Sequence, residues 1–194
     1  IIADGRIIEK INIKGSVMAF VSQTPEKPEE VYISGLNKIK PIKITGVNKK
    51  IPSYPVGKTE IIKWSSTDGL EIEGLLTYPA GYEKGREYPL LLVIHGGPPA
   101  AFQTEFIAAP WNYPLASFAS EGYLILRPNV RGSDGYGLDF RKANLKDLGG
   151  MDFQDLMSGV DHVINMGIAD KNRLGIMGRS YGGFLTAWTI TQTD

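Results

Sequence analysis

The sequence contains no cysteine among its 194 residues. Disulfide bonds, thiolate metal sites and cysteine nucleophiles are therefore excluded together. An excess of charge is also lacking, because 21 basic residues balance 21 acidic ones and no basic stripe stands out. We therefore expect no nucleic-acid partner. The longest apolar run, Leu90 to Ile94, is too short to cross a bilayer, so we expect no membrane partner either.

The beginning of the chain has neither an initiator methionine nor a signal-peptide pattern. We therefore expect an internal piece of a longer protein, and we assign that protein to the cytoplasm. A length of 194 residues suits one medium domain together with part of another. The chemistry argued below requires neither a cofactor nor a metal.

Residues 1–50 have the pattern of short strands. β-branched residues are common, and turns rich in glycine, proline, asparagine or lysine separate the segments, which favours an antiparallel meander. Such a meander is about one blade of a β-propeller, and one blade has little core of its own. We therefore expect residues 1–50 to be the end of a β-propeller domain and 51–57 to be a linker. The expected strands are Arg6 to Ile13, Ser16 to Ser22, Glu29 to Ser34 and Lys40 to Thr45.

From residue 58 onward the pattern changes to strands that alternate with helices. Continuous apolar runs of strand length are typical of strands buried on both faces of a parallel sheet. This alternation predicts an α/β domain with a mainly parallel sheet and flanking helices. The expected elements are a hairpin over 60–64 and 70–78, buried strands over 88–94, 123–126 and 174–177, and helices over 111–120, 152–166 and 184–191.

The helix over 152–166 is the clearest of these. Asp152 is expected to be its N-cap, and Asp155 to add negative charge to the first turn. Gly167 is expected to end it. One apolar stripe at helical spacing consists of Phe153, Leu156, Met157, Val160, Val163 and Ile164.

The strongest chemical signal is the sequence Gly178-Arg179-Ser180-Tyr181-Gly182. A buried strand precedes it and a helix-compatible stretch follows, which is the context that a G-x-S-x-G nucleophile elbow requires. The turn would expose the Ser180 hydroxyl, and glycines would allow close backbone approach. The alternative is a glycine-rich turn that merely contains a serine. We interpret Ser180 as the nucleophile of an α/β-hydrolase fold.

A second signal, His95-Gly96-Gly97-Pro98, directly follows the buried strand 88–94. Such a turn supplies a backbone N–H to the oxyanion hole, and the residue after the nucleophile supplies the other. Gly97 and Tyr181 are the expected donors. His95 precedes the serine, whereas the fold's base follows it, so we interpret His95 as a structural residue of this turn.

The general base itself is missing from the sequence. No histidine follows Ser180, the only acid after it is Asp194, and His162 is expected to be an ordinary exposed histidine. Arg131 lies in a glycine-rich segment after the strand 123–126. It is either a substrate-orienting residue or, as we favour, part of a salt bridge that holds this segment.

Five motifs together resemble the prolyl oligopeptidase family of serine peptidases, in its acylaminoacyl-peptidase and dipeptidyl-peptidase-like branch. The resemblance covers about 58–194 and is weaker over the first fifty residues. These motifs are His95-Gly96-Gly97-Pro98, Asn129-Val130-Arg131-Gly132-Ser133, Gly135-Tyr136-Gly137, Gly149-Gly150-Met151-Asp152 and Gly178-Arg179-Ser180-Tyr181-Gly182-Gly183.

The resemblance implies a serine peptidase that cleaves oligopeptides near their N-termini, behind a β-propeller that restricts large substrates. It also implies that residues 58–194 are the N-terminal part of an α/β-hydrolase catalytic domain. The family's aspartate and histidine would lie beyond Asp194, so the chain alone is expected to be inactive. Arg179 departs from the glycine common at that position in this branch.

Two other functions stay open on the sequence alone. A carboxylesterase or lipase would share both the elbow and the His95-Gly96-Gly97 turn. A binding protein with a relic elbow would keep the same motifs without activity. We also expect an open sheet edge at 174–177, and with it either a second chain that carries the rest of the domain or a homo-oligomer.

Overall fold

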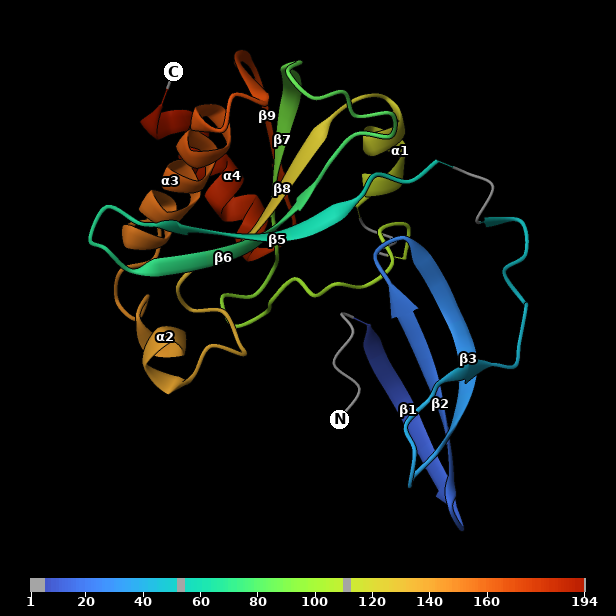
Figure 1. Ribbon diagram of the computed structural model, residues 1–194. Helices are drawn as coiled ribbons and strands as arrows, with labels where there is room; N and C mark the ends of the chain where they lie inside the picture. The colour runs from blue at the N-terminus through green and yellow to red at the C-terminus, as the bar shows by residue number, and fades with distance from the viewer. Residues whose placement is uncertain (1–5, 52–54, 110–112, 194) are drawn as a thin grey trace.

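The structure is a computed structural model that describes residues 6–51, 55–109 and 113–193. Part of the expected linker 51–57, the first residues of the expected helix 111–120, and Asp194 lie outside the described residues. Two sheets are described, one built from residues 7–43 and one from residues 59–178 (Figure 1).

The N-terminal sheet is an antiparallel meander, as the sequence predicts. Its strands follow the chain in the order β1-β2-β3-β4. The last strand is shorter than expected, and it begins later because Pro41 directly precedes it and has no N–H to donate to the ladder. In the described residues this sheet stays open, so its place in a β-propeller remains a prediction. The strands are β1 (Ile7–Lys14), β2 (Val17–Thr24), β3 (Lys27–Gly35) and β4 (Ile42–Lys43).

The second sheet has the order β5-β6-β8-β7-β9. Strand β7 pairs in parallel with β8 and β9, whereas β6 pairs antiparallel with β5 and β8. The sheet is therefore mixed rather than mainly parallel, because a tight turn joins β5 to β6 and only antiparallel strands can be joined so closely. The strands are β5 (Thr59–Ser65), β6 (Glu71–Thr77), β7 (Tyr88–Ile94), β8 (Leu124–Asn129) and β9 (Ala169–Gly178).

Helices connect the strands of this sheet. The helix α3 begins at Met151 with Gly150 as N-cap, so the expected N-cap role of Asp152 is wrong. Asp152 instead lies within the first turn, where its carboxylate accepts hydrogen bonds from the N–H groups of Gly149 and Phe153. The helices are α1 (Leu115–Ser120), α2 (Leu138–Lys142, which the sequence pattern did not indicate), α3 (Met151–Asn165) and α4 (Tyr181–Gln192).

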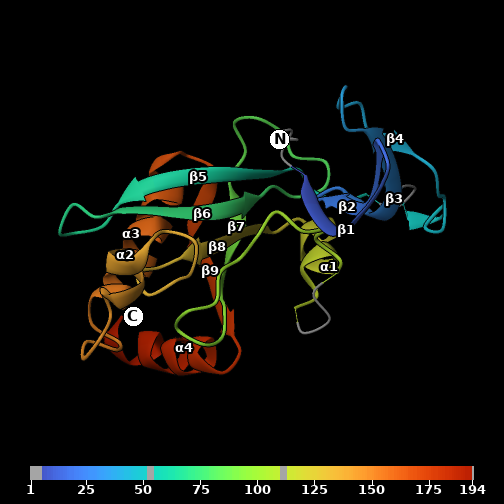
Figure 2. The ribbon, with the colours of Figure 1, turned by 90° about the horizontal axis from the view of Figure 1, so that it is seen from below.

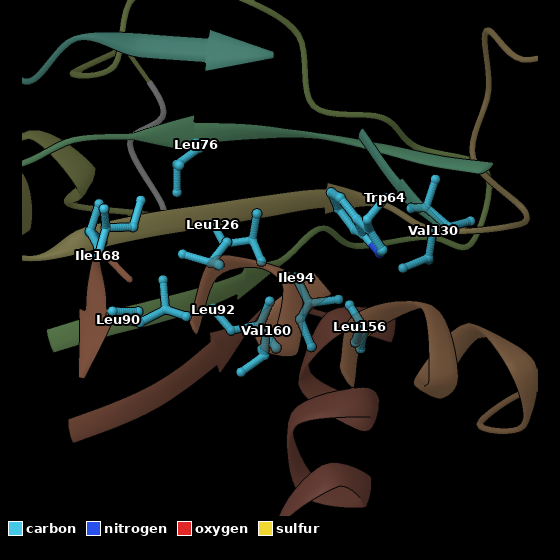
Figure 3. Close-up of a cluster of buried hydrophobic side chains, with 14 of the residues drawn as sticks. Trp64, Leu76, Leu90, Leu92, Ile94, Leu126, Val130, Leu156, Val160 and Ile168 are labelled. Carbon is cyan, nitrogen blue, oxygen red and sulfur yellow. The ribbon is translucent and has the colours of Figure 1, made fainter. Parts of the chain in front are cut away.

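Side chains on the two faces of the sheet form separate cores. Along β7, Leu90 and Leu92 pack with residues of α3, and the intervening Leu91 packs with residues of α1. This alternation follows from the two-residue period of a strand. Figure 3 shows the larger core, in which Leu156 and Val160 of α3 meet the strands. The helices thus cover both faces, which holds the carboxyl ends of β7 and β9 rigidly side by side.

Contacts from the end of β2 and from the turn after it join the N-terminal sheet to the rest of the molecule. The N–H of Ile107 donates to the Pro25 carbonyl at 3.0 Å, and the N–H of Phe106 donates to Gln23 Oε1 at 2.9 Å. Figure 2 shows this sheet beside α1. At the opposite side, β9 is an edge strand of the five-stranded sheet, as expected for 174–177. Among the described residues, no helix is long and apolar enough to cross a membrane.

Candidate active site

Ser180 lies in the tight turn between β9, which ends at Gly178, and α4, which begins at Tyr181. Its backbone has φ 57° and ψ −120°, a conformation that residues other than glycine rarely adopt. Ser180 is exposed to solvent. Strain of this kind persists only where the surrounding structure imposes it, and it often marks functional sites. The predicted strand–elbow–helix context of Ser180 is therefore present.

Glycines on either side of Ser180 make this turn possible. A Cβ atom on Gly178 would lie 2.3 Å from the Gly182 carbonyl oxygen. A Cβ atom on Gly182 would lie 2.2 Å from the Ile94 carbonyl oxygen. Both distances are far inside van der Waals contact, so only glycine allows α4 to pack this closely against β7 and β9.

The turn after β7 lies against this elbow. A Cβ atom on Gly96 would be 3.0 Å from the Arg179 carbonyl oxygen and 3.2 Å from the Ser180 Cβ. Gly97 has φ +53°, in the left-handed region that favours glycine. One cavity of about 360 Å³ is lined by residues of both turns, including Gly97 and Ser180. Adjacent parallel strands thus bring the two predicted motifs together.

Tyr181 connects the elbow to α3 through its side chain. As the first residue of α4, Tyr181 has a backbone N–H without a partner inside the helix. Its phenol donates a hydrogen bond to Asp152, which is fully buried. Burial raises the pKa of Asp152, and burial together with this carboxylate raises the pKa of Tyr181. Sequence reasoning missed this partnership, although Asp152 stands in a motif with two glycines.

His95 is buried beneath the same turn. Its Nδ1 lies 3.2 Å from the Gly96 carbonyl oxygen and its Nε2 lies 3.1 Å from Ser133 Oγ. Burial lowers the pKa of His95, which favours the neutral ring. Both ring nitrogens therefore hold loops in place, in agreement with the structural role expected for this residue.

His162 lies elsewhere, on α3. It is half-buried rather than exposed, and its ring stacks on Trp64 with 6.4 Å between centroids. The expectation of an ordinary exposed histidine is therefore wrong in part, because the indole covers one face of the ring. The sequence contains 2 histidines, and the contacts described for each are structural.

Arg131 forms the salt bridge that we favoured over a role in substrate binding. Its guanidinium lies 2.8 Å from Asp155 Oδ1 and 2.9 Å from Asp68 Oδ2. Arg131 and Asp155 are buried, and the arginine lowers the pKa of Asp68 to about 2. The network links the loop after β8 to α3 and to the β5–β6 turn. Asp155 thus pairs with Arg131, and the expectation that it adds negative charge to the first turn of α3 is wrong.

Comparisons with known proteins show which family part of this chain resembles. Residues 111–194 match the family model described as the prolyl oligopeptidase family. This part of the chain belongs to the prolyl oligopeptidase family. The segment includes the elbow and the Asp152 motif, whereas the Gly97 turn precedes it.

Among the described residues, no group of three or more His, Asp or Glu side chains is arranged to hold a metal ion.

Relatives extend the likeness to most of the chain. It is 36% identical over 172 residues to the uncharacterized peptidase YuxL of Bacillus subtilis, covering 88% of this chain and 25% of that protein. It is 33% identical over 174 residues to the acylamino-acid-releasing enzyme of Arabidopsis thaliana, covering 88% of this chain and 20% of that protein. The chain thus spans about a quarter or less of these curated relatives.

A solved structure has a fold similar to that of this chain. The acylaminoacyl peptidase of Pyrococcus horikoshii superimposes with a TM-score of 0.85 at 29% sequence identity. The alignment covers 99% of this chain and 30% of that protein. The α/β architecture is therefore that of peptidases in this family.

Proposed function

We propose that this chain carries the nucleophile of a serine peptidase that cleaves oligopeptides, in the manner of an acylaminoacyl or dipeptidyl peptidase. The observation that carries the proposal is the strained backbone of Ser180, held at φ 57° against the turn that contains Gly97. An acylaminoacyl peptidase of similar fold was solved in complex with Z-Gly-Gly-Phe-chloromethyl ketone, a peptide-like ligand.

In this proposal the Ser180 oxygen attacks the carbonyl carbon of a peptide bond, and its proton passes to a histidine. That base is supplied from outside these 194 residues, since His95 and His162 have structural contacts. The backbone N–H groups of Gly97 and Tyr181 stabilise the negative oxygen of the tetrahedral intermediate. The C–N bond then breaks, and the histidine returns the proton to the departing amine.

The second half of the reaction reverses the roles of water and serine. Water attacks the carbonyl carbon of the acyl-enzyme ester and gives its proton to the same histidine. The C–O bond to Ser180 then breaks, the histidine returns the proton to the serine oxygen, and the acid is released. The mechanism uses neither a cofactor nor a metal. In this proposal Gly97 contributes from the turn after β7 and Ser180 from the turn after β9.

Replacing the nucleophile tests this proposal. In the longest natural polypeptide that contains this chain, Ser180→Ala should lower peptide hydrolysis at least about 10³-fold. Wild-type protein should also react with a fluorophosphonate probe at Ser180. Ser120→Ala is the control, and it should keep the labelling, because Ser120 is exposed at the end of α1 and its hydroxyl donates to the Ser117 carbonyl.

Substrate comparison separates the alternatives. Peptide anilides should be cleaved in a reaction that depends on Ser180, whereas an enzyme that hydrolyses p-nitrophenyl esters but no peptide anilide would favour the carboxylesterase. A full-length protein that fails to label would contradict catalysis altogether. The 194-residue chain by itself should show no turnover on either substrate.

A further inference from the structure

Glu105 lines the same cavity as Ser180. The cavity holds about 360 Å³, which accommodates one amino-acid residue or a large side chain. Gly97, Phe102 and Tyr113 contribute to its wall, as does Arg179 of the elbow. Most of the lining is neutral, so its two charged residues, Glu105 and Arg179, decide which groups bind there.

The carboxylate of Glu105 has no direct polar partner. The residue is half-buried, and within the described ranges no hydrogen bond or ion pair reaches its side chain. Burial raises the pKa of Glu105, the charge of Arg127 lowers it, and that of Glu9 raises it. An ionised carboxylate accepts hydrogen bonds and donates none. A donor is therefore needed to compensate Glu105 for the water that it has lost through burial.

Arg127 explains how a negative charge is maintained at this position. It lies on β8 with no exposed surface, and its guanidinium carbon is 5.6 Å from the centroid of the Phe102 ring. Burial lowers the pKa of Arg127 to about 10, so the group stays charged at neutral pH. Arg127 is not among the residues that line the cavity, and its charge favours the ionised form of Glu105.

The cavity is lined by one charged residue of each sign, Glu105 and Arg179. Burial raises the pKa of Tyr113, while a hydrogen bond from the backbone of Arg179 and the charge of Arg179 lower it. The charges that act on Glu105 are instead those of Arg127 and Glu9. A positive group of a ligand is attracted to Glu105 and repelled by Arg179.

We propose that Glu105 is a specificity-determining residue that binds a cationic group of the peptide, either its N-terminal ammonium or a lysine or arginine side chain. The inference rests on the proposed peptidase function and adds the substrate class. A neutral group at this position would leave a half-buried carboxylate unpaired, and sites that lose a charged hydrogen bond in this way reject the analogue strongly.

Matched pairs of peptide anilides test the inference in the longest natural polypeptide that contains this chain. One pair differs in a free or acetylated N-terminus, and the other in lysine or norleucine beside the scissile bond. The wild type should prefer one cationic member by about 10- to 100-fold in kcat/KM. The pair that shows the preference identifies whether the ammonium or the side chain is bound.

Two substitutions assign that preference to Glu105. Glu105→Gln should reduce the preference to within about threefold, and Glu105→Lys should reverse it, while both keep Ser180 labelling by a fluorophosphonate. Glu29→Gln, at an exposed position of β3, is the matched control and should change neither the preference for the cationic substrate nor the labelling of Ser180.

The outcomes separate this inference from the proposed function. Ser180-dependent hydrolysis with no preference for a cation, or a preference unchanged in labelled Glu105→Gln, overturns the role of Glu105 alone. Hydrolysis that persists in Ser180→Ala, or no hydrolysis of any peptide, overturns the proposed function and this inference with it.

Discussion

The phenol of Tyr181 links the expected oxyanion donor to a buried carboxylate on another helix. Asp152 also accepts hydrogen bonds from the backbone of Gly149 and Phe153, each at 2.9 Å, so it is firmly held. We regard Asp152 as a positioning residue that acts through Tyr181. The sequence placed Tyr181 beside the nucleophile, but nothing in the spacing of 152 and 181 indicated that their side chains meet.

Removing the Tyr181 hydroxyl tests this role. Tyr181→Phe should lower kcat by about tenfold with little change in KM, less than the ~10²–10³ lost with an entire oxyanion donor. The reason is that the ring and backbone remain while the bond that fixes them is lost. Steady-state kinetics on a peptide anilide provides the measurement.

Asp152→Asn should retain most of the activity, because an amide oxygen still accepts from the phenol, whereas Asp152→Ala should not. Tyr123→Phe, before β8 at the other end of the sheet, serves as the control. Equal losses of kcat in all four variants would argue for a general effect on folding.

At the level of elements, the close packing of α4 on the sheet depends on Gly182. Gly182→Ala should destabilise the protein by about 1–3 kcal/mol or more, because its Cβ would meet backbone carbonyl oxygens that cannot move aside. Fluorophosphonate labelling of Ser180 should fall as well. Urea unfolding and labelling rates measure the two effects.

The neighbouring Gly183 provides a matched control. A Cβ on Gly183 would lie 3.5 Å from the Gly178 carbonyl oxygen, an ordinary contact. Gly183→Ala should therefore be neutral or stabilising by up to about 1 kcal/mol, as expected for alanine inside a helix. If both substitutions behave alike, the close approach at Gly182 is not what shapes the elbow.

Most strands and helices could be predicted from the sequence, and the reasons are local. The run over 88–94 is the strand β7 without a shift at either end, because five consecutive apolar residues suit a strand buried on both faces. The ends of strands and helices were predicted less accurately where residues distant in the sequence determine them. The short helix α2 was missed, since its five residues contain no buried side chain to give it a periodic apolar face.

For the whole molecule, the exposed surface is larger than its mass requires. The accessible area is 10842 Å², whereas a compact monomer of this mass exposes about 9,100 Å². Part of the excess lies around the edge strand β9 and helix α4, where Leu174 is 48% and Ile190 is 67% exposed. An open edge beside apolar side chains favours pairing with another chain.

We therefore predict that the 194-residue chain associates in solution, either with itself or with a chain that carries the complementary part of the domain. Light scattering at micromolar concentration should give a mass above the 21.3 kDa of one chain. Leu174→Lys should reduce association, because a charged side chain on an edge strand opposes pairing. A monodisperse monomer would contradict the prediction.

The sequence by itself determined the strands, the main helices and the two glycine-rich turns, because periodicity and glycine content are local properties. It also placed Ser180 in a turn of the right type. Only the tertiary structure decided that the Gly97 turn lies against Ser180, that Asp152 meets Tyr181, and that Glu105 and Arg127 act on the same cavity. These contacts join residues far apart in the chain, and they depend on strand order and on helix packing, which no short stretch of sequence encodes.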